Sequence, residues 1–344
     1  MSPDKKIKIL IVDDSLLFRK TLENHLIMDS HFDVVGTAID SKDAMDKIIK
    51  LKPDVLTLDV EMPKVNGIDF LKQLMPTHPM PVVVVSSQPA NALNALDAGA
   101  VDFVRKPDEA KGVDFNSFIN ELIVKIKIAS TARTGRKLIK KPLAPSNQLT
   151  ATNSHTVISI GASTGGTEAI LSVIKDLPVT TPGIVIVQHM PPVFTNMYAE
   201  RLNKLCKMHV KEAEDGDRVQ TGSVLVAAGG KHMTLHKDTK GYYIHSREGE
   251  KVSSHCPSVD VLFNSVAKCA GKHSIGIILT GMGGDGSKGL LSIKKSGGYT
   301  LGQDRETCVV YGMPMVANNI GAVTKQLPLN QISSEIINYL NSKA

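Results

Sequence analysis

The sequence predicts an α/β protein of two domains joined by a linker, and three observations support that prediction. The chain has 344 residues, which is longer than a typical single domain with one hydrophobic core. Short β-branched runs alternate with helical stretches in both halves, which is typical of parallel sheets covered by helices on both faces. Between the halves, residues 129–153 lose apolar periodicity and gain Pro, Ser, Thr and Asn, as linkers do.

The first predicted domain covers residues 1–128. Five strands are expected, at residues 7–12, 34–38, 55–58, 82–85 and 101–104. Ser15 comes directly after the first strand, where its hydroxyl can cap a helix that begins near Leu16. The last helix of this domain is expected at about residues 115–128.

The second predicted domain covers residues 154–344 and is doubly wound, with a mostly parallel sheet. Strands are expected at residues 157–160, 183–187, 224–227 and 275–279, and helices near 167–174, 258–270 and 287–295. Residues 232–256 lack the helical period, which favours a hairpin in that stretch.

Composition excludes several classes of protein. The formal net charge is +6, but residues 129–155 contain five Lys or Arg and no acid, so the rest of the chain carries only +1. A nucleic-acid surface on either folded domain is therefore not indicated. The four cysteines form no Cys-x-x-Cys pair, which favours reduced, structural thiols. We also expect a cytoplasmic protein, since no apolar stretch could span a bilayer and no signal-peptide core is present.

Acidic and polar side chains follow four strands of the first domain. They are Asp13 and Asp14 after the first strand, Asp59 after the third, Ser86 after the fourth and Lys106 after the fifth. Each alone has a plainer interpretation as a helix cap or a loop residue, but parallel strands bring all five to one sheet edge. Clustered carboxylates call for a hard cation such as Mg²⁺. The pattern predicts that Asp59 attacks a phosphoryl group, which Lys106 neutralises and Ser86 binds.

Residues 5 to about 128 resemble a response-regulator receiver domain, a fold with a flavodoxin-like, five-stranded parallel sheet. The matching residues are Asp13-Asp14, the run Asp59-Val60-Glu61-Met62-Pro63, Ser86 and Lys106-Pro107. The resemblance implies that Asp59 accepts a phosphoryl group from a histidine kinase. It implies an Mg²⁺ site formed by Asp13, Asp14, Asp59 and the Glu61 backbone carbonyl, and an aromatic switch at Phe103. Val65-Asn66-Gly67 departs from the family's more usual Met-Asp-Gly, in a loop outside the chemistry.

A second chemical motif occupies residues 161–166, where a strand passes through glycine into a helix. Ser163 lies in this turn, which lifts a hydroxyl above the sheet edge. His189 follows the next strand, and Asp285 follows a later one in a glycine-rich loop. A nucleophile, a base and an orienting acid at one edge satisfy the logic of a catalytic triad in any chain order. Asp260 and Asp304 compete for the third role, but the glycine-rich loop favours Asp285.

Two alternatives for this domain are weaker. A dinucleotide site needs Gly-x-Gly-x-x-Gly and an acid after the next strand, whereas this chain has Gly-x-x-x-Gly-Gly and ends that strand with Gln188-His189. A metal site at His232 and His236 lacks a third ligand, so we expect these histidines at the surface or beside the substrate.

Four motifs in order resemble those of the chemotaxis protein-glutamate methylesterase family, the CheB family, over residues 154 to about 340. They are Gly161-Ala-Ser163-Thr-Gly-Gly, Val187-Gln-His189-Met-Pro-Pro, Leu279-Thr-Gly-Met282-Gly-Gly-Asp285-Gly and Val309-Val-Tyr-Gly-Met-Pro314. The resemblance implies hydrolysis of glutamate γ-methyl esters on methyl-accepting chemoreceptors, with release of methanol, and deamidation of receptor glutamines.

The same resemblance assigns Ser163, His189 and Asp285 as the triad, with Thr164 and the Met282 amide as oxyanion contacts and no cofactor for ester hydrolysis. Ala228 stands where proline is usual and Cys256 where arginine is common, which leaves the substrate contacts open.

Together, the two halves predict a hydrolase activated by phosphorylation. Its expected partners are the receptors and a histidine kinase, with no nucleic acid and no membrane contact except through receptors. We hypothesise that the unphosphorylated receiver covers the serine site. A different class, a receiver-controlled binding or nucleotide-binding protein, is less favoured because the second domain has neither a basic recognition helix nor clustered aromatic residues, and the chain has no Trp.

Overall fold

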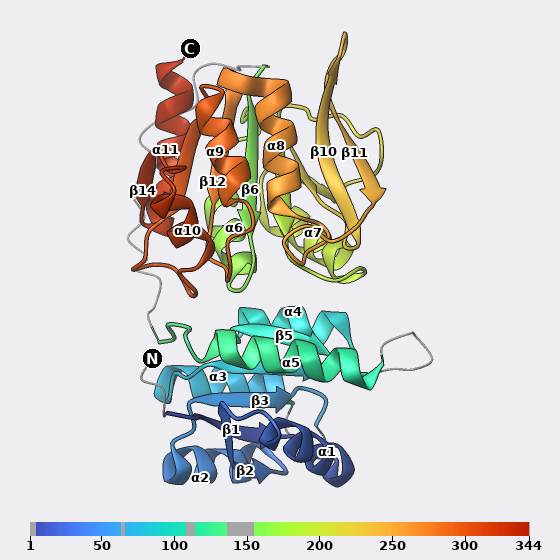
Figure 1. Ribbon diagram of the computed structural model, residues 1–344, viewed down its shortest axis with the longest axis vertical. Coiled ribbons are helices and arrows are strands. Elements are labelled where there is room, and N and C mark those ends of the chain that lie inside the picture. Colours follow the sequence, from blue (N-terminus) through green and yellow to red (C-terminus); the bar gives the residue numbers. More distant parts are fainter. Residues whose placement is uncertain (1–4, 63–65, 108–113, 136–154, 344) are drawn as a thin grey trace. The chain divides into compact units, whose positions relative to one another are not determined.

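The computed structural model describes residues 5–62, 66–107, 114–135 and 155–343 (Figure 1). The chain divides into two compact units, Met1–Arg136 and Lys137–Ala344, and each is an α/β domain. The predicted fold class is therefore confirmed. The domain limits at residues 128 and 154 stay predictions, because most of the expected linker lies outside the described residues.

The N-terminal unit contains a five-stranded sheet of order β2-β1-β3-β4-β5, in which every pairing is parallel. The strands are β1 (Ile7–Val12), β2 (Phe32–Ala38), β3 (Val55–Asp59), β4 (Val82–Ser86) and β5 (Asp102–Arg105). Strands β3 and β4 are buried along their whole length, as expected for central strands covered on both faces. All five predicted strands are present.

In the part of this unit that the structure describes, five helices flank the sheet. They are α1 (Leu16–Ile27), α2 (Ser41–Leu51), α3 (Gly67–Thr77), α4 (Pro89–Asp97) and α5 (Phe115–Ala129). The Ser15 hydroxyl accepts a hydrogen bond from the Phe18 amide at 3.3 Å, which confirms the predicted cap of the first helix. Helix α1 contacts α5, while α3 contacts both α2 and α4.

The C-terminal unit is built on a seven-stranded sheet of order β14-β13-β12-β6-β7-β9-β8, again with every pairing parallel. Its strands are β6 (Val157–Ala162), β7 (Ile184–Gln188), β8 (His209–Glu212), β9 (Ser223–Val226), β12 (Ser274–Ile278), β13 (Tyr299–Gln303) and β14 (Lys325–Leu327). The expectations included β6, β7, β9 and β12 and missed β8, β13 and β14. Two of the missed strands are short, half-exposed edges that lack a long β-branched run.

Among residues 155–343, a hairpin and six α-helices complete this unit. The helices are α6 (Gly166–Ile174), α7 (Phe194–Leu205), α8 (Val259–Ala270), α9 (Ser287–Lys295), α10 (Met313–Asn319) and α11 (Leu329–Ser342), with a short 3-10 helix at Gly271–His273. Strands β10 (Lys231–Asp238) and β11 (Gly241–Glu248) pair antiparallel, which confirms the predicted hairpin. Helix α8 packs between α9 and this hairpin (Figure 1).

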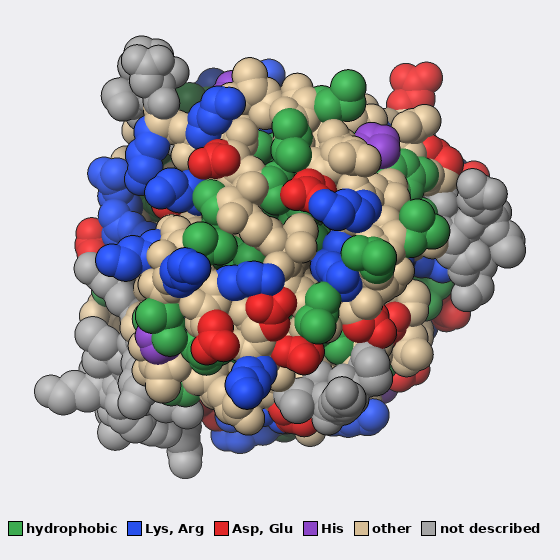
Figure 2. Space-filling model, turned by 90° about the horizontal axis from the view of Figure 1, so that it is seen from below, with side chains coloured by type: hydrophobic (Ala, Val, Ile, Leu, Met, Phe, Trp, Pro, Cys, Tyr) green, Lys and Arg blue, Asp and Glu red, His purple; other side chains and the backbone are tan. Residues whose placement is uncertain are grey.

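The surface and the thiols agree with the composition. On the face drawn in Figure 2, Lys and Arg side chains gather toward the left, and over the centre and right they lie among Asp and Glu side chains. The cysteines Cys206, Cys256, Cys269 and Cys308 are all free thiols. Among the described residues, no helix is both long enough and apolar enough to cross a membrane.

Candidate active site and phosphoryl pocket

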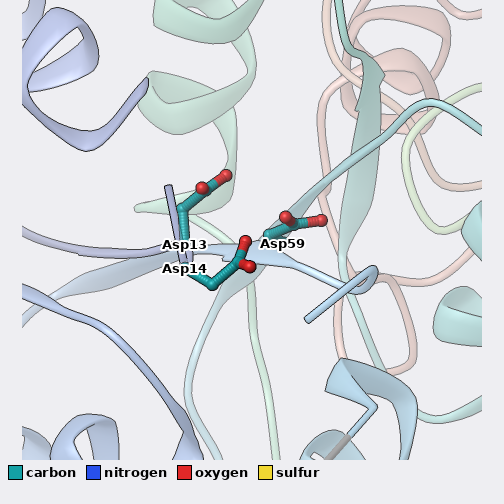
Figure 3. Close-up of side chains that lie close together, drawn as sticks. All are labelled: Asp13, Asp14 and Asp59. Atoms are coloured by element: carbon teal, nitrogen blue, oxygen red, sulfur yellow. The ribbon is translucent and has the colours of Figure 1, made fainter. Parts of the chain in front are cut away.

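Three carboxylates gather at the carboxyl edge of the N-terminal sheet. Asp13 and Asp14 follow β1, and Asp59 is the last residue of β3; their ligand atoms all lie within 4.8 Å of one another (Figure 3). Lys106, just after β5, places its Nζ 2.6 Å from Asp59 Oδ2 and 3.2 Å from Asp13 Oδ2. The structure thus brings the predicted acidic residues and the lysine together.

Burial and the neighbouring charges of this pocket shift the pKa values of Asp13 and Lys106. Burial is the largest cause that raises the pKa of Asp13 to about 6, with the Lys106 charge opposing it and the Asp59 charge adding to it. Burial would lower the pKa of Lys106, but its hydrogen bond to Asp59 and the charge of Asp13 raise it. Three carboxylates, two of them buried, are an oxygen donor set that fits Mg²⁺.

The other predicted residues of the receiver make contacts of their own, which involve Ser86, Glu61 and Phe103. The Ser86 hydroxyl, at the end of β4, donates to the Glu61 carboxylate at 3.0 Å, and the Gln88 amide donates to the same oxygen at 3.0 Å. The Glu61 amide donates to Asp59 Oδ1 at 2.9 Å. Phe103 is buried in β5, and the Lys125 Nζ lies 4.8 Å from the centre of its ring. Ser86 is therefore held by Glu61 in this structure.

The serine motif forms a sharp turn between β6 and α6. Ser163 directly follows β6 and is half-buried. Gly165 caps α6 with φ of 76°, and a Cβ at this position would meet the Val309 side chain at 2.6 Å. Only glycine fits both the left-handed backbone and the close packing. The turn therefore presents Ser163 at the carboxyl edge of the sheet.

His189 and Asp285 form a buried pair at the same edge. His189 follows β7, Asp285 lies in the loop between β12 and α9, and His189 Nε2 is 2.8 Å from Asp285 Oδ2. The two side chains are only 6% and 2% exposed. His189 Nδ1 is buried and has no hydrogen-bond partner among the described residues. With Nε2 donating to the carboxylate, Nδ1 keeps the lone pair that can accept a proton.

The Asp285 carboxylate is fixed by the start of helix α8. It accepts hydrogen bonds from Ser258 Oγ at 2.7 Å, the Val259 amide at 2.7 Å and the Asp260 amide at 3.1 Å. Burial would raise the pKa of Asp285, but the hydrogen bonds and charge of His189 and the bond from Ser258 outweigh it and lower the pKa. The carboxyl is thus held ionised where it faces the imidazole.

Buried polar contacts tie the serine turn to the neighbouring strands. The Thr280 hydroxyl donates to the Thr164 carbonyl at 3.0 Å, and the Ser163 amide donates to the Thr280 carbonyl at 3.0 Å. Gln188 Nε2 donates to the Ser163 carbonyl at 2.9 Å. A Cβ added to Gly281 would come within 2.7 Å of the Ser163 Cβ, so the loop after β12 packs directly on the serine.

The competing acids make other contacts, one to helix α9 and one within a turn. Asp260 accepts a hydrogen bond from the Gly289 amide at 2.7 Å in the first turn of α9, and Asp304 accepts one from the Thr307 amide at 2.9 Å. Thr164 is buried beside the serine, and Met282, in the loop after β12, is 46% exposed. The oxyanion roles of Thr164 and Met282 stay predictions.

Comparisons with known proteins match both units. A model of the response regulator receiver domain matches residues 9–114, and a model of the CheB methylesterase matches residues 158–336. Over 337 residues the chain is 53% identical to protein-glutamate methylesterase/protein-glutamine glutaminase 2 of Syntrophomonas wolfei, covering 98% of each chain. The chain belongs to the CheB methylesterase family.

Two further relatives of the CheB family are also similar. The protein-glutamate methylesterase/protein-glutamine glutaminase of Salmonella typhimurium is 46% identical over 339 residues, 96% of each chain. The crystal structure of the Thermotoga maritima CheB methylesterase catalytic domain is 38% identical, with a TM-score of 0.52 over 54% of this chain and 98% of that chain. The chain is a receiver-containing member of this hydrolase family.

The sequence did not point to several residues that organise the CheB-type site. Ser258 was expected only as the start of a helix, and its bond to Asp285 depends on tertiary packing. His232 is expected at the surface or beside substrate; it is partly exposed, and its Nδ1 accepts from the Ser258 amide at 3.2 Å. His255 stacks on His189 with ring centroids 3.6 Å apart. In the sequence, these three residues are marked only as polar side chains beside the predicted hairpin and the helix that follows it.

Proposed function

We propose that this protein is a phosphorylation-activated hydrolase that removes methyl groups from glutamate γ-methyl esters of methyl-accepting chemoreceptors and deamidates receptor glutamines. The observation that carries the proposal is the His189–Asp285 pair beside the serine turn, with a lone pair left on His189 Nδ1. The receiver and the family membership supply the regulatory half. The names of the relatives, protein-glutamate methylesterase/protein-glutamine glutaminase, agree with the substrates that we propose for this protein.

In the proposed mechanism, Ser163 Oγ attacks the ester carbonyl carbon while its proton passes to His189 Nδ1. Asp285 stabilises the imidazolium that forms, through the bond at Nε2. His189 then gives the proton to the departing methoxide, which leaves as methanol. Water, deprotonated by the same nitrogen, attacks the acyl-enzyme and releases the glutamate carboxylate with Ser163 restored. With a glutamine substrate, the same steps release ammonia.

Two effects, general-base catalysis and stabilisation of the oxyanion, account for much of the expected acceleration of hydrolysis. Proton transfer through a positioned base contributes roughly 10²–10⁴ in rate. Each amide that donates to the oxyanion contributes about 10²–10³ more, and we assign this role to the Thr164 amide and the Met282 amide. Helix α6 begins at Gly166, three residues after Ser163, so its N-terminal dipole supports negative charge near the serine.

At the receiver, Asp59 is the proposed phosphoacceptor from a histidine kinase. Asp13, Asp14, Asp59 and the Glu61 carbonyl would hold Mg²⁺, which when bound neutralises charge on the phosphoryl oxygens. Lys106 already contacts Asp59 and can pair with the phosphoryl anion. For Ser86 to bind that anion, its hydroxyl must exchange the Glu61 carboxylate for a phosphoryl oxygen. The Phe103 ring is the proposed switch residue.

The energy needed for activation is within reach of such contacts. Suppose that the receiver restrains the serine site in most unphosphorylated molecules. Shifting the population to mostly unrestrained molecules takes about 5.5 kcal/mol of stabilisation of the unrestrained state relative to the restrained one. Charge-assisted hydrogen bonds contribute roughly 1.5–3 kcal/mol each, so two or three phosphoryl contacts suffice.

The proposed protein is cytoplasmic. It binds the receptors and does not insert into the membrane itself.

Methanol release from receptor membranes carrying labelled methyl esters tests the hydrolase. We expect release by the wild-type protein and a loss of at least about 10³-fold in Ser163→Ala, the scale of a missing nucleophile. Thr167→Ala is a matched control, since Thr167 is a buried hydroxyl residue in the first turn of α6, four residues after Ser163, and has no proposed chemical role. Equal release by wild type and Ser163→Ala would overturn the assignment of the nucleophile.

A further inference from the structure

We infer that His255 is a positioning residue for the base of the reaction, and the inference rests on the proposed role of His189. The two imidazole rings stack with centroids 3.6 Å apart and planes inclined by 11°. His189 makes its hydrogen bond to Asp285 in its own ring plane, so the stacked ring covers a face rather than an edge. His255 therefore limits rotation of the base without competing for either nitrogen.

His255 is presented by a tight turn that the backbone closes at both ends. The Val252 amide donates to the His255 carbonyl at 3.0 Å, and the His255 amide donates to the Val252 carbonyl at 3.0 Å. The two central residues, Ser253 and Ser254, have φ of 52° and 69°, the backbone of a type I′ turn. Serine rarely adopts this conformation, and such strain is held only where the surroundings over-determine it.

Further contacts anchor this segment to the hairpin. His232, at the start of β10, accepts from the Ser258 amide through Nδ1 at 3.2 Å, and its Nε2 lies 2.8 Å from the Glu250 carbonyl. The Gly230 amide donates to the Cys256 carbonyl at 3.1 Å. Because Nδ1 of His232 accepts a hydrogen bond, its Nε2 carries the hydrogen and donates to the Glu250 carbonyl. His232 thus holds both ends of residues 250–258.

The same segment acts on both members of the buried pair. Ser258 donates to Asp285 at 2.7 Å, and three positions earlier His255 stacks on the base. A base that must receive a proton at Nδ1 while donating from Nε2 needs its ring plane fixed, since rotation about the Cβ–Cγ bond breaks both alignments. This restraint acts on kcat rather than on receptor binding.

Three substitutions separate stacking from filling of space. His255→Phe keeps a planar ring, His255→Leu keeps apolar bulk without a ring, and His255→Gln keeps polarity without a ring. The readouts are kcat and KM for methanol release from methylated receptor membranes, with urea unfolding to check the fold. His273→Leu, an exposed histidine in the 3-10 helix of the same unit, is the matched control.

We expect kcat to fall roughly 3- to 10-fold in His255→Leu and His255→Gln, the range of one aromatic stacking contact, with KM within about twofold of wild type. His255→Phe should stay within about twofold of wild type in both constants. Wild-type kcat in both ring-free variants, or an equal loss in His255→Phe and the ring-free variants, would overturn the inference. A wild-type protein that releases no methanol would instead refute the proposed function, so the two failures are distinct. If His255→Leu unfolds, the comparison of His255→Phe with His255→Gln decides.

Discussion

Replacing Ser258 with alanine should slow hydrolysis by about 10- to 150-fold. Its hydroxyl is fully buried and donates to the Asp285 carboxylate at 2.7 Å. A hydrogen bond to a charged group contributes about 1.5–3 kcal/mol, and each 1.36 kcal/mol of transition-state energy is tenfold in rate. The carboxylate keeps its bonds from the Val259 and Asp260 amides and from His189, so the triad weakens without collapsing.

The assay compares kcat for methanol release in Ser258→Ala and Ser265→Ala, with urea unfolding of each. Ser265 lies in helix α8, which Ser258 caps. Its hydroxyl accepts from the Leu235 amide at 2.8 Å and donates to the Leu262 carbonyl at 2.6 Å, so Ser265→Ala removes two hydrogen bonds to neutral groups and serves as the matched control. Both variants should lose about 1–3 kcal/mol of unfolding free energy, but only Ser258→Ala should lose kcat beyond about threefold. Equal kcat losses in the two variants would refute the claim that Ser258 orients Asp285 for catalysis.

Three other outcomes are expected. Because the folded-state pKa of Asp285 lies below its ordinary value, its stabilisation is complete above about pH 5 and is lost as pH falls through that lowered pKa. The gap in unfolding free energy between wild type and Asp285→Asn should accordingly narrow from pH 5 to pH 3, and a gap that widens would contradict this. Chelation of Mg²⁺ with EDTA should abolish acid-labile phosphate at Asp59 from acetyl phosphate, and added Mg²⁺ should restore it; labelling that survives EDTA would exclude the metal role. Removal of residues 1–150 should raise basal methanol release, whereas unchanged release would refute restraint by the receiver.

Much of the fold could be predicted because the central strands carry their own signal. Residues 55–58 and 82–85 are runs of β-branched and aliphatic side chains, and the structure buries both strands completely. The edge strands β8 and β14 were missed because half-exposed strands alternate polar and apolar residues over only a few positions. Strand β13 was missed because its YTLGQ sequence contains glycine and polar residues within a buried strand.

The candidate site divides in the same way. Ser163, His189 and Asp285 could be predicted because each follows a strand of one parallel sheet, and topology alone brings such residues to one edge. The choice of imidazole nitrogen could not, since it depends on where the loop after β12 places the carboxylate. The stacking of His255 depends on a turn held by His232, at the start of the preceding hairpin, and local sequence patterns do not encode such a contact.

The central claim is that phosphorylation at Asp59 controls hydrolysis at Ser163. Methanol release from methylated receptor membranes, measured with and without a small phosphodonor, tests it in three proteins: wild type, Asp59→Ala and Ser163→Ala. We expect the phosphodonor to accelerate release by the wild-type protein, to leave Asp59→Ala at its basal rate and to produce no release from Ser163→Ala. Equal acceleration in wild type and Asp59→Ala, or methanol release by Ser163→Ala, would contradict it.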